Sequence, residues 1–266
     1  LGRLFYLFFS FFWCTVGFRR GKAPPIGGIC LAEPKKQNYL HGAAILAAGV
    51  VIMKILGFIY KVPLGNILGD EGYTHFLVAY NIYSVFLTVA TAGLPVALSR
   101  MISEANTMNR PNQVKRIFSV AWLTFCVLGV VCTLIMFLFP TELADALNDV
   151  EASQSILALS PAVLLVCLTS AYRGYCQGHE NMKPTTVGQV LEVLVKVVIG
   201  LVLAWYLKDL GKSLPLVSAG AIFGVTAGSL AALVYMFAYK RRNYAALPGG
   251  GDEPESRGQI LSTLLK

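Results

Sequence analysis

The chain has 266 residues, of which 56% are hydrophobic and only 14% are charged. A soluble domain of this size normally has about a quarter of its residues charged, and the apolar residues here come in blocks as long as the roughly 20-residue helix that crosses a bilayer. The composition therefore excludes an ordinary soluble protein and indicates an integral membrane protein. The net charge of +8 then reports topology rather than nucleic-acid binding, since Lys and Arg gather in short loops between the apolar blocks.

Residue patterns that would carry catalysis or bind a metal are missing from the sequence. The six cysteines form no CxxC pair and mostly lie in apolar runs, which is typical of buried thiols. His41, His75 and His179 are scattered, with no partner at metal-ligand spacing. The chain has neither a Walker loop nor a GxSxG motif. We therefore expect no enzyme activity, no metal, and no nucleotide or other cofactor.

The first segment is an apolar stretch, residues 1–18, that could be an additional span, a signal sequence or a translated segment upstream of the true start. Arg19, Arg20 and Lys22 follow this stretch, whereas a cleaved signal carries its basic residues before the apolar run. We interpret residues 1–34 as an amino-terminal hydrophobic extension, either an anchor or a start-site artefact.

Six further apolar runs are long enough to cross a bilayer. Because backbone polar groups cannot go unpaired in lipid, each run is expected to be a helix. The predicted fold class is therefore an all-α membrane protein, with a six-helix transmembrane bundle over residues 35–245. The six predicted spans are Gly42–Tyr60, Phe76–Leu98, Ile117–Phe139, Ile156–Tyr172, Thr185–Leu207 and Pro215–Tyr239.

The connecting segments alternate in charge. One set of segments carries many basic residues, and the other carries few basic residues among acidic ones. The positive-inside rule places the basic set in the cytoplasm, so both ends of the six-span unit are expected there. The basic set holds Lys35, Lys36, Arg100, Arg110, Lys115, Arg116, Arg173, Lys183, Lys240, Arg241 and Arg242, and the other set holds Lys61, Lys208 and Lys212.

The last segment, residues 246–266, reads as a cytoplasmic linker followed by the start of a seventh span. The stretch PGGGDEPESRG (248–258) is polar and rich in Gly and Pro, and QILSTLLK after it looks like the opening of another helix. This pattern suggests that the chain is truncated.

Two lysines share one face of the first predicted span. Lys54 and Lys61 are seven residues apart, so they lie on the same side of a helix. At 1.5 Å per residue, Lys54 lies about 10 Å below the outer end. Each ammonium could reach the interface by snorkelling, or it could face a substrate.

The second predicted span is polar at one point and broken at another. Asn81 lies between Tyr80 and Tyr83, and Gly93 with Pro95 interrupts the helix near its inner end. Proline kinks a membrane helix, and interrupted helices often flank the substrate path of a transporter. We interpret Asn81 as a substrate-binding residue and Gly93 and Pro95 as a hinge, with a plain packing kink as the alternative.

The fifth predicted span carries a carboxylate and an ammonium inside an apolar run, GQVLEVLVKVVIGL (188–201). Glu192 and Lys196 are spaced i, i+4 with the acid first, which is the better order for a helical ion pair. Lys196 is near the midplane, too deep to snorkel easily. Charges inside a membrane usually face a bundle interior or a watery cavity and mark a pathway. Glu192 and Lys196 are therefore the first candidates for a functional site, with a purely structural pair as the alternative.

Several stretches resemble a known family of exporters. The likeness covers about residues 35–239, and GLPVALSR and RGYCQGHENMKPT are its most specific segments. The chain is similar to polysaccharide-biosynthesis exporters of the stage V sporulation protein B branch in GAAILAAGVVIMKILGFIYKVPLGNILGDEGY (42–73), AYNIYSVFLTVATAGLPVALSRMISE (79–104) and AYRGYCQGHENMKPTTVGQVLEVLVKVVIG (171–200).

The resemblance implies the multidrug, oligosaccharidyl-lipid and polysaccharide exporter superfamily, whose members have twelve to fourteen helices in two lobes and work by alternating access. This chain would be the amino-terminal lobe, partnered by a missing carboxyl-terminal lobe. We expect it to contact membrane lipid and to flip an undecaprenyl-diphosphate-linked saccharide across the bacterial cytoplasmic membrane, driven by membrane potential or an ion gradient. The saccharide would serve peptidoglycan synthesis, polysaccharide synthesis or sporulation. Lys54, Lys61 and Lys196 would attract the diphosphate, if their helices converge, and Glu192 would tune Lys196 or couple to a cation.

One departure and three alternatives qualify this expectation. Tyr60 and Lys61 stand in the region where the lipid II flippase has arginines, so its substrate does not transfer directly. A cation-coupled multidrug exporter of the same superfamily is the first alternative, although it favours an acidic, aromatic-lined site. A membrane enzyme acting on polyprenyl phosphates is less favoured because Glu104 and Glu180 stand alone, without an acidic metal-binding cluster. A structural scaffold is also less favoured, because the buried charges point to function.

Overall fold

A computed structural model of the protein describes residues 39–91, 93–244 and 253–265. The predicted amino-terminal extension and most of the predicted linker lie outside these residues. Every regular element in the described part is a helix, and no strand is present there. The all-α prediction is confirmed.

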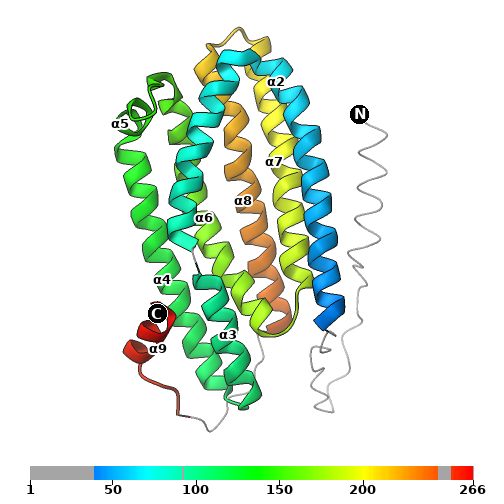
Figure 1. The fold of residues 1–266 in the computed structure, drawn as a ribbon, viewed down its shortest axis with the longest axis vertical. Helices are drawn as coiled ribbons and strands as arrows, with labels where there is room; N and C mark the ends of the chain where they lie inside the picture. Colours follow the sequence, from blue (N-terminus) through cyan, green and yellow to red (C-terminus); the bar gives the residue numbers. More distant parts are fainter. Residues whose placement is uncertain (1–38, 92, 245–252, 266) are drawn as a thin grey trace. The chain divides into compact units, whose positions relative to one another are not determined.

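The first described helix, α2 (Tyr39–Thr91), contains the first predicted span and most of the second. Figure 1 shows its two legs running in opposite directions, joined by a bend at one end of the bundle. Gly69 forms this bend with φ 68° and ψ −175°, a backbone conformation that glycine adopts at little cost. The predicted spans were too short, because residues 61–75 continue the two legs instead of forming a loop.

The predicted break in the second span is confirmed. α2 ends at Thr91, and α3 (Leu94–Thr107) begins after Gly93, whose φ of 75° lies in the left-handed region. Pro95 occupies the first turn of α3, where its missing N–H leaves no hydrogen bond unmade. Figure 1 shows α3 continuing roughly along the second leg of α2 beyond the break.

The remaining long helices follow the predicted spans but extend past them. The clearest difference is in α6, which continues through Pro161 and past Tyr172. Arg173 is therefore in a helix, and its assignment to a connecting segment was wrong. The helices are α4 (Pro111–Leu138), α6 (Ser153–Gly178), α7 (Lys183–Asp209) and α8 (Leu214–Tyr244).

Three short elements complete the described part. Between α4 and α6 lie α5 (Pro140–Asp145) and a single 3₁₀ turn, η1 (Val150–Ala152). The expected helix at the carboxyl end is present as α9 (Arg257–Leu265). The segment before α9 is tied to α4, because the amide of Glu255 donates to Gln113 Oε1 at 2.8 Å.

Length and composition give five helical segments in the described residues that can cross a membrane. The first, Ala44–Thr107, contains both legs of α2 and therefore accounts for two of the six predicted spans. The other four are the segments around α4, α6, α7 and α8. The protein is thus a multi-pass membrane protein.

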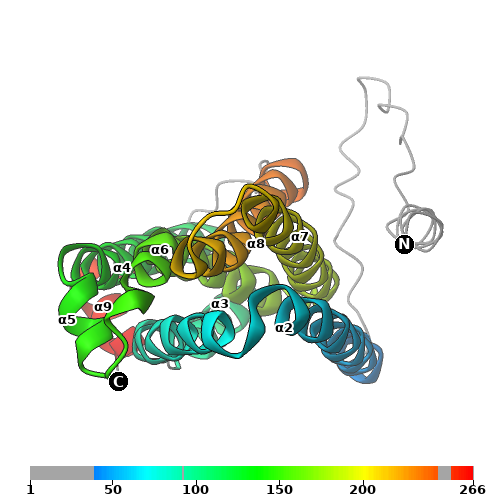
Figure 2. The ribbon, with the colours of Figure 1, turned by 90° about the horizontal axis from the view of Figure 1, so that it is seen from above.

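α7 and α8 pack at close range through glycines. Figure 2 shows α8 between α6 and α7. A Cβ atom on Gly224 would lie 2.6 Å from the carbonyl oxygen of Lys196 and 2.6 Å from the amide nitrogen of Gly200. One added on Gly228 would overlap the carbonyl oxygen of Glu192. Small residues every fourth position let membrane helices approach this closely, and here they fix the part of α7 that carries both predicted charges.

Candidate functional site

Glu192 on α7 is held by residues from two other helices. Arg173 of α6 donates from Nη2 to Glu192 Oε2 at 2.6 Å, and Ser229 of α8 donates to Oε1 at 3.4 Å. The side chains of Arg173 and Glu192 are only 15% and 21% exposed. The prediction that Glu192 pairs with Lys196 is wrong, because α6 extends far enough to bring Arg173 to the carboxylate.

Lys196, one turn further along α7, contacts aromatic rings instead of a carboxylate. Its Nζ lies 4.8 Å from the ring centroid of Tyr80 and 5.7 Å from that of Tyr60. Within the described residues, no carboxylate is at ion-pair distance from it. Aromatic faces stabilise an ammonium by roughly 0.5–2 kcal/mol each without neutralising it. The Lys196 amine therefore faces aromatic rings and remains open to contact with an anion.

Tyr60 is itself fixed in place. It is only 4% exposed, and its hydroxyl donates to the carbonyl of Ala221 on α8 at 3.3 Å. A Cβ on Gly200 would lie 2.9 Å from the same hydroxyl, so the ring fits closely against α7. Tyr60 is a rigid wall for the Lys196 ammonium.

These side chains form one group, which we call the interior polar cluster. It carries two cations and one carboxylate, so its net charge is +1. The Nε of Arg173 is buried and has no hydrogen-bond partner in the described part of the protein. The cluster thus holds the amine of Lys196 and an unused guanidinium donor on Arg173. The members of the cluster are Tyr60, Tyr80, Arg173, Glu192, Lys196 and Ser229.

The other predicted binding residues are on α2, and only part of them joins the cluster. Lys61 is exposed but close enough to act electrostatically on Lys196. Lys54 and Asn81 are exposed and make no contact with Lys196 in the described structure. The predicted convergence of three lysines therefore reduces to Lys61 and Lys196 in this structure.

The break before α3 lies next to the cluster. A Cβ on Gly174, the residue after Arg173, would come within 2.9 Å of the Pro95 carbonyl oxygen. A Cβ on Gly93 would meet no atom within 4 Å, so there is room for a side chain. Glycine is favoured here because the backbone has a φ of 75°. A movement of Pro95 would therefore shift the turn of α6 that carries Arg173.

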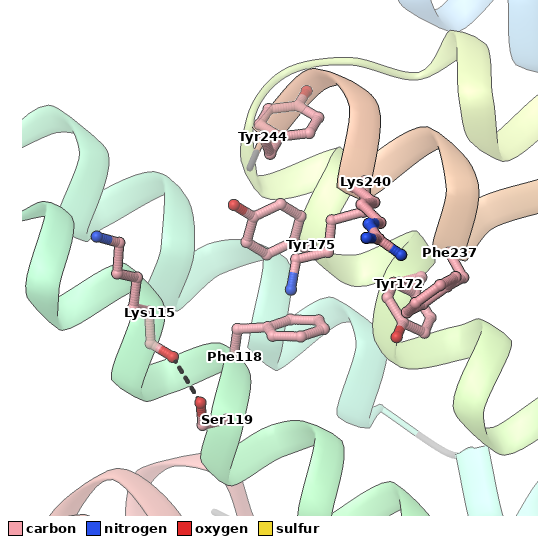
Figure 3. Close-up of a pocket in the computed structure, with 9 residues that line it drawn as sticks. Lys115, Phe118, Ser119, Tyr172, Tyr175, Phe237, Lys240 and Tyr244 are labelled. Carbon is pink, nitrogen blue, oxygen red and sulfur yellow. Dashed lines mark hydrogen bonds between the residues drawn. The ribbon is translucent and has the colours of Figure 1, made fainter. Parts of the chain in front are cut away.

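A pocket of about 460 Å³ lies where α4, α6 and α8 meet at the α3 end of the bundle. Figure 3 shows three basic side chains and an aromatic wall around it. Lys240 Nζ sits 3.1 Å from the Phe118 ring centroid and 4.8 Å from that of Tyr175. None of the described residues that line the pocket is acidic. Its lining residues are Lys115, Phe118, Ser119, Tyr172, Tyr175, Phe237, Lys240, Arg241 and Tyr244.

Sequence reasoning missed this pocket because Lys115, Lys240 and Arg241 were read only as topology markers. A signal was present: Phe237, Lys240, Arg241 and Tyr244 recur every three to four residues, which places them on one helix face.

His179, in the turn after α6, borders the pocket residues Tyr175 and Tyr244, with ring centroids 4.6 and 4.8 Å away. Asn106 donates from Nδ2 to His179 Nδ1 at 3.0 Å, so the proton of the neutral ring is on Nε2. Burial, together with the charge of Lys240, lowers the pKa of His179 to about 4. The imidazole is therefore neutral near pH 7.

Residues 39–262 match the family described as polysaccharide biosynthesis protein. The chain belongs to this family. Among its relatives in Bacillus subtilis (strain 168), the chain is 32% identical over 203 residues to stage V sporulation protein B, covering 76% of the chain and 39% of that protein. It is 28% identical over 218 residues to lipid II flippase MurJ, covering 78% of the chain and 40% of that protein. The chain thus spans about two fifths of the family relatives it matches.

Solved transporters share the fold. A MATE protein determined in complex with MaD3S matches 86% of this chain and 52% of its own, with a TM-score of 0.66 and 17% identity. A MOP superfamily transporter from Pyrococcus furiosus Vc1 (DSM3638) matches 86% of this chain and 51% of its own, with a TM-score of 0.64 and 15% identity. The helix bundle therefore has the fold of about half of such a transporter.

Proposed function

We propose that this chain is the amino-terminal lobe of a transporter that flips a lipid-linked saccharide across the cytoplasmic membrane by alternating access. The observation that carries this proposal is the interior polar cluster, where Lys196 lies inside a membrane bundle with no carboxylate at ion-pair distance among the described residues. A cation left unpaired in this way is costly and suits an anionic ligand. Family membership and the likeness to lipid II flippase MurJ make a diphosphate-linked saccharide the favoured class.

Within this function, Lys196 and Lys61 attract the diphosphate, and the free Nε of Arg173 adds a donor. An ammonium binds phosphate as a point charge, whereas a guanidinium adds directed hydrogen bonds. Glu192 holds Arg173 in position through its 2.6 Å contact. Lys54 and Asn81 on α2 would meet the substrate from the exposed side of the bundle.

The pocket around Lys240 is a suitable first contact for the headgroup. The positive-inside rule assigns its end of the bundle to the cytoplasm, the side where such precursors are made. The three basic side chains that line the pocket favour a phosphate, and the aromatic wall suits sugar or prenyl surface. Gly93 and Pro95 would act as the hinge between this end and the interior polar cluster.

A carboxyl-terminal lobe would close the other side of the path. Relatives are about two and a half times as long as the matched region, which leaves room for it. Membrane potential or an ion gradient would drive the cycle.

A cation-coupled multidrug exporter is the second candidate. It is favoured by the fold shared with a MATE protein and by the aromatic walls of Tyr60 and Tyr80 beside a carboxylate, Glu192. The excess of cations over carboxylates in the cluster opposes it.

Transport by the full-length protein in vesicles separates the two candidates. Vesicles loaded on one leaflet with a fluorescent undecaprenyl-diphosphate saccharide should show transfer that depends on the protein. A cationic dye offered to the same vesicles should remain where it was placed. Dye export without headgroup transfer would overturn the flippase proposal in favour of the exporter.

A further inference from the structure

We propose that Glu71, His75 and Glu151 bind a divalent transition-metal ion, with Zn²⁺ the favoured ion, at the Gly69 bend of α2. This inference does not depend on the proposed transport function. The sequence suggested no metal site, because His75 has no partner at ligand spacing that would mark one. The fold brings the partners to it from another part of the chain.

The ligand atoms are already close together. One ligand atom from each of Glu71, His75 and Glu151 lies within 4.8 Å of the other two, and His75 Nε2 is 3.4 Å from Glu151 Oε2. Two ligands about 2.0–2.1 Å from a tetrahedral zinc ion are about 3.3 Å apart. The His75–Glu151 separation fits this geometry without movement. Glu71 is one helical turn before His75 and exposed, so a small rotamer change brings its carboxylate in.

His75 is prepared as a ligand by its other nitrogen. Both carboxylate oxygens of Asp149 lie 2.7 Å from His75 Nδ1. A carboxylate accepts hydrogen bonds, so Nδ1 carries a proton, and Nε2 is the nitrogen left to bind a metal ion. Metal-binding histidines are commonly oriented by such a carboxylate.

The Nε2 atom lies 3.4 Å from Glu151 Oε2 but makes no hydrogen bond to it. His75 is only 6% exposed, and its Nε2 is buried with no hydrogen-bond partner among the described residues. An unsatisfied buried polar atom is costly. A metal ion between Nε2 and the two glutamates would satisfy it.

The donor set selects the kind of ion. One imidazole nitrogen with carboxylate oxygens suits zinc and its neighbours, whereas Ca²⁺ and Mg²⁺ prefer oxygen ligands throughout. Three carboxylates surround the His75 ring, so a divalent ion also relieves their mutual repulsion. Glu71 and Glu151 are exposed, which leaves a fourth position open to water.

A bound ion would connect two distant segments of the chain. Glu71 and His75 belong to the second leg of α2, and Glu151 belongs to η1 before α6. The ion would hold the bend of α2 to the start of the α6 segment, at the end of the bundle opposite the Lys240 pocket.

Zinc binding to the full-length protein in detergent tests the proposal. After chelator treatment and dialysis, metal analysis and calorimetry count the Zn²⁺ ions retained by wild type and by His75→Gln, Glu151→Gln and Glu142→Gln. Glu142 is an exposed acid on the nearby α5 and is the matched control. The difference in retained Zn²⁺ between wild type and each variant excludes zinc bound by cysteines or by other histidines, because these residues are the same in all of the proteins.

We expect wild type and Glu142→Gln to retain one Zn²⁺ more than His75→Gln, and Glu151→Gln to bind that ion at least tenfold more weakly. Zn²⁺ should raise the thermal unfolding temperature of wild type, with no such shift in His75→Gln. Glu151 is exposed, so its variant folds and keeps the test decisive if His75→Gln does not. Equal zinc binding by wild type and Glu151→Gln would overturn the proposal, as would displacement of the ion by equimolar Ca²⁺.

Discussion

Removing the Arg173 guanidinium while Glu192 stays in place should be strongly destabilising. The two charges meet at 2.6 Å, and both side chains are at least 79% buried. At an effective dielectric constant of 20, two unit charges about 4 Å apart attract by about 4 kcal/mol. Breaking a buried pair on one side costs about 3–5 kcal/mol, because the remaining charge is left without compensation.

Two features place Arg173→Gln near the lower end of that range. Some solvent reaches both groups, and Ser229 still donates to Glu192 at 3.4 Å. We therefore expect a loss of about 3 kcal/mol in the free energy of unfolding. For a domain of this size, such a loss lowers the thermal midpoint by ~6–12 °C. Equilibrium unfolding in mixed micelles and a thermal melt give the two quantities.

A double-mutant cycle makes the assignment specific. Combining Arg173→Gln with Glu192→Gln should cost at least 1.5 kcal/mol less than the sum of the single changes, because contacting charges couple by about 0.5–3 kcal/mol. The same cycle for Lys196→Gln with Glu192→Gln should give a clearly smaller coupling energy. If the Lys196 cycle shows the larger coupling, the helical i, i+4 pair exists in solution and the Arg173 assignment is refuted.

Three further predictions concern packing, pH and the pocket. Gly224→Leu should separate α7 from α8 and lower the free energy of unfolding by more than about 3 kcal/mol. Gly57→Ala, whose Cβ meets no atom within 4 Å, should raise it by about 0.5–1 kcal/mol. Unfolding in micelles measures both changes. Because the pKa of His179 falls from 6.5 in the unfolded chain to about 4 in the folded one, only the unfolded state takes up this proton between those values. The free energy of unfolding should therefore decrease as the pH drops from 6.5 to 4. His179→Gln should flatten this part of the pH profile. An unchanged profile in that variant would contradict the burial of the ring. Lys240→Met should weaken binding of a diphosphate-linked headgroup about tenfold, since a charge-assisted hydrogen bond contributes about 1.5–3 kcal/mol. Lys183→Met, which changes an exposed lysine, should leave the affinity unchanged. Equal affinities of wild type and Lys240→Met in a fluorescence titration would remove the pocket from the substrate path.

The spans and the break at Gly93 could be predicted from sequence because they depend on local properties. Hydropathy over about 20 residues identifies a membrane helix, and Gly followed by Pro stops one. The helix ends were less accurate. Amphipathic turns beyond the apolar run, such as residues 61–75 and 173–178, continue the helix without adding hydropathy.

The partners of the charges could not be predicted, because they depend on how helices meet. Glu192 and Lys196 suit each other within one helix, yet Arg173 from α6 reaches Glu192 first. His75 is another example, since its carboxylates Asp149 and Glu151 are more than seventy residues away in sequence. A single sequence contains no information on such pairs.

The Lys240 pocket lies between these two cases. The spacing of Phe237, Lys240 and Tyr244 on one face of α8 is visible in the sequence. Its counterpart on α4 and α6 is not, because the facing of Phe118 toward Tyr175 is set by packing.

Headgroup transfer by Lys196 variants of the full-length protein is the most direct test of the proposed flippase function. Lys196→Ala should reduce transfer of a fluorescent undecaprenyl-diphosphate saccharide to the rate of protein-free vesicles, and Lys196→Arg should retain part of it. Lys212→Ala, which removes an exposed lysine between α7 and α8, should transfer at the wild-type rate. Transfer by Lys196→Ala at the wild-type rate, in protein shown to be folded and inserted, would contradict the claim that this ammonium binds the diphosphate.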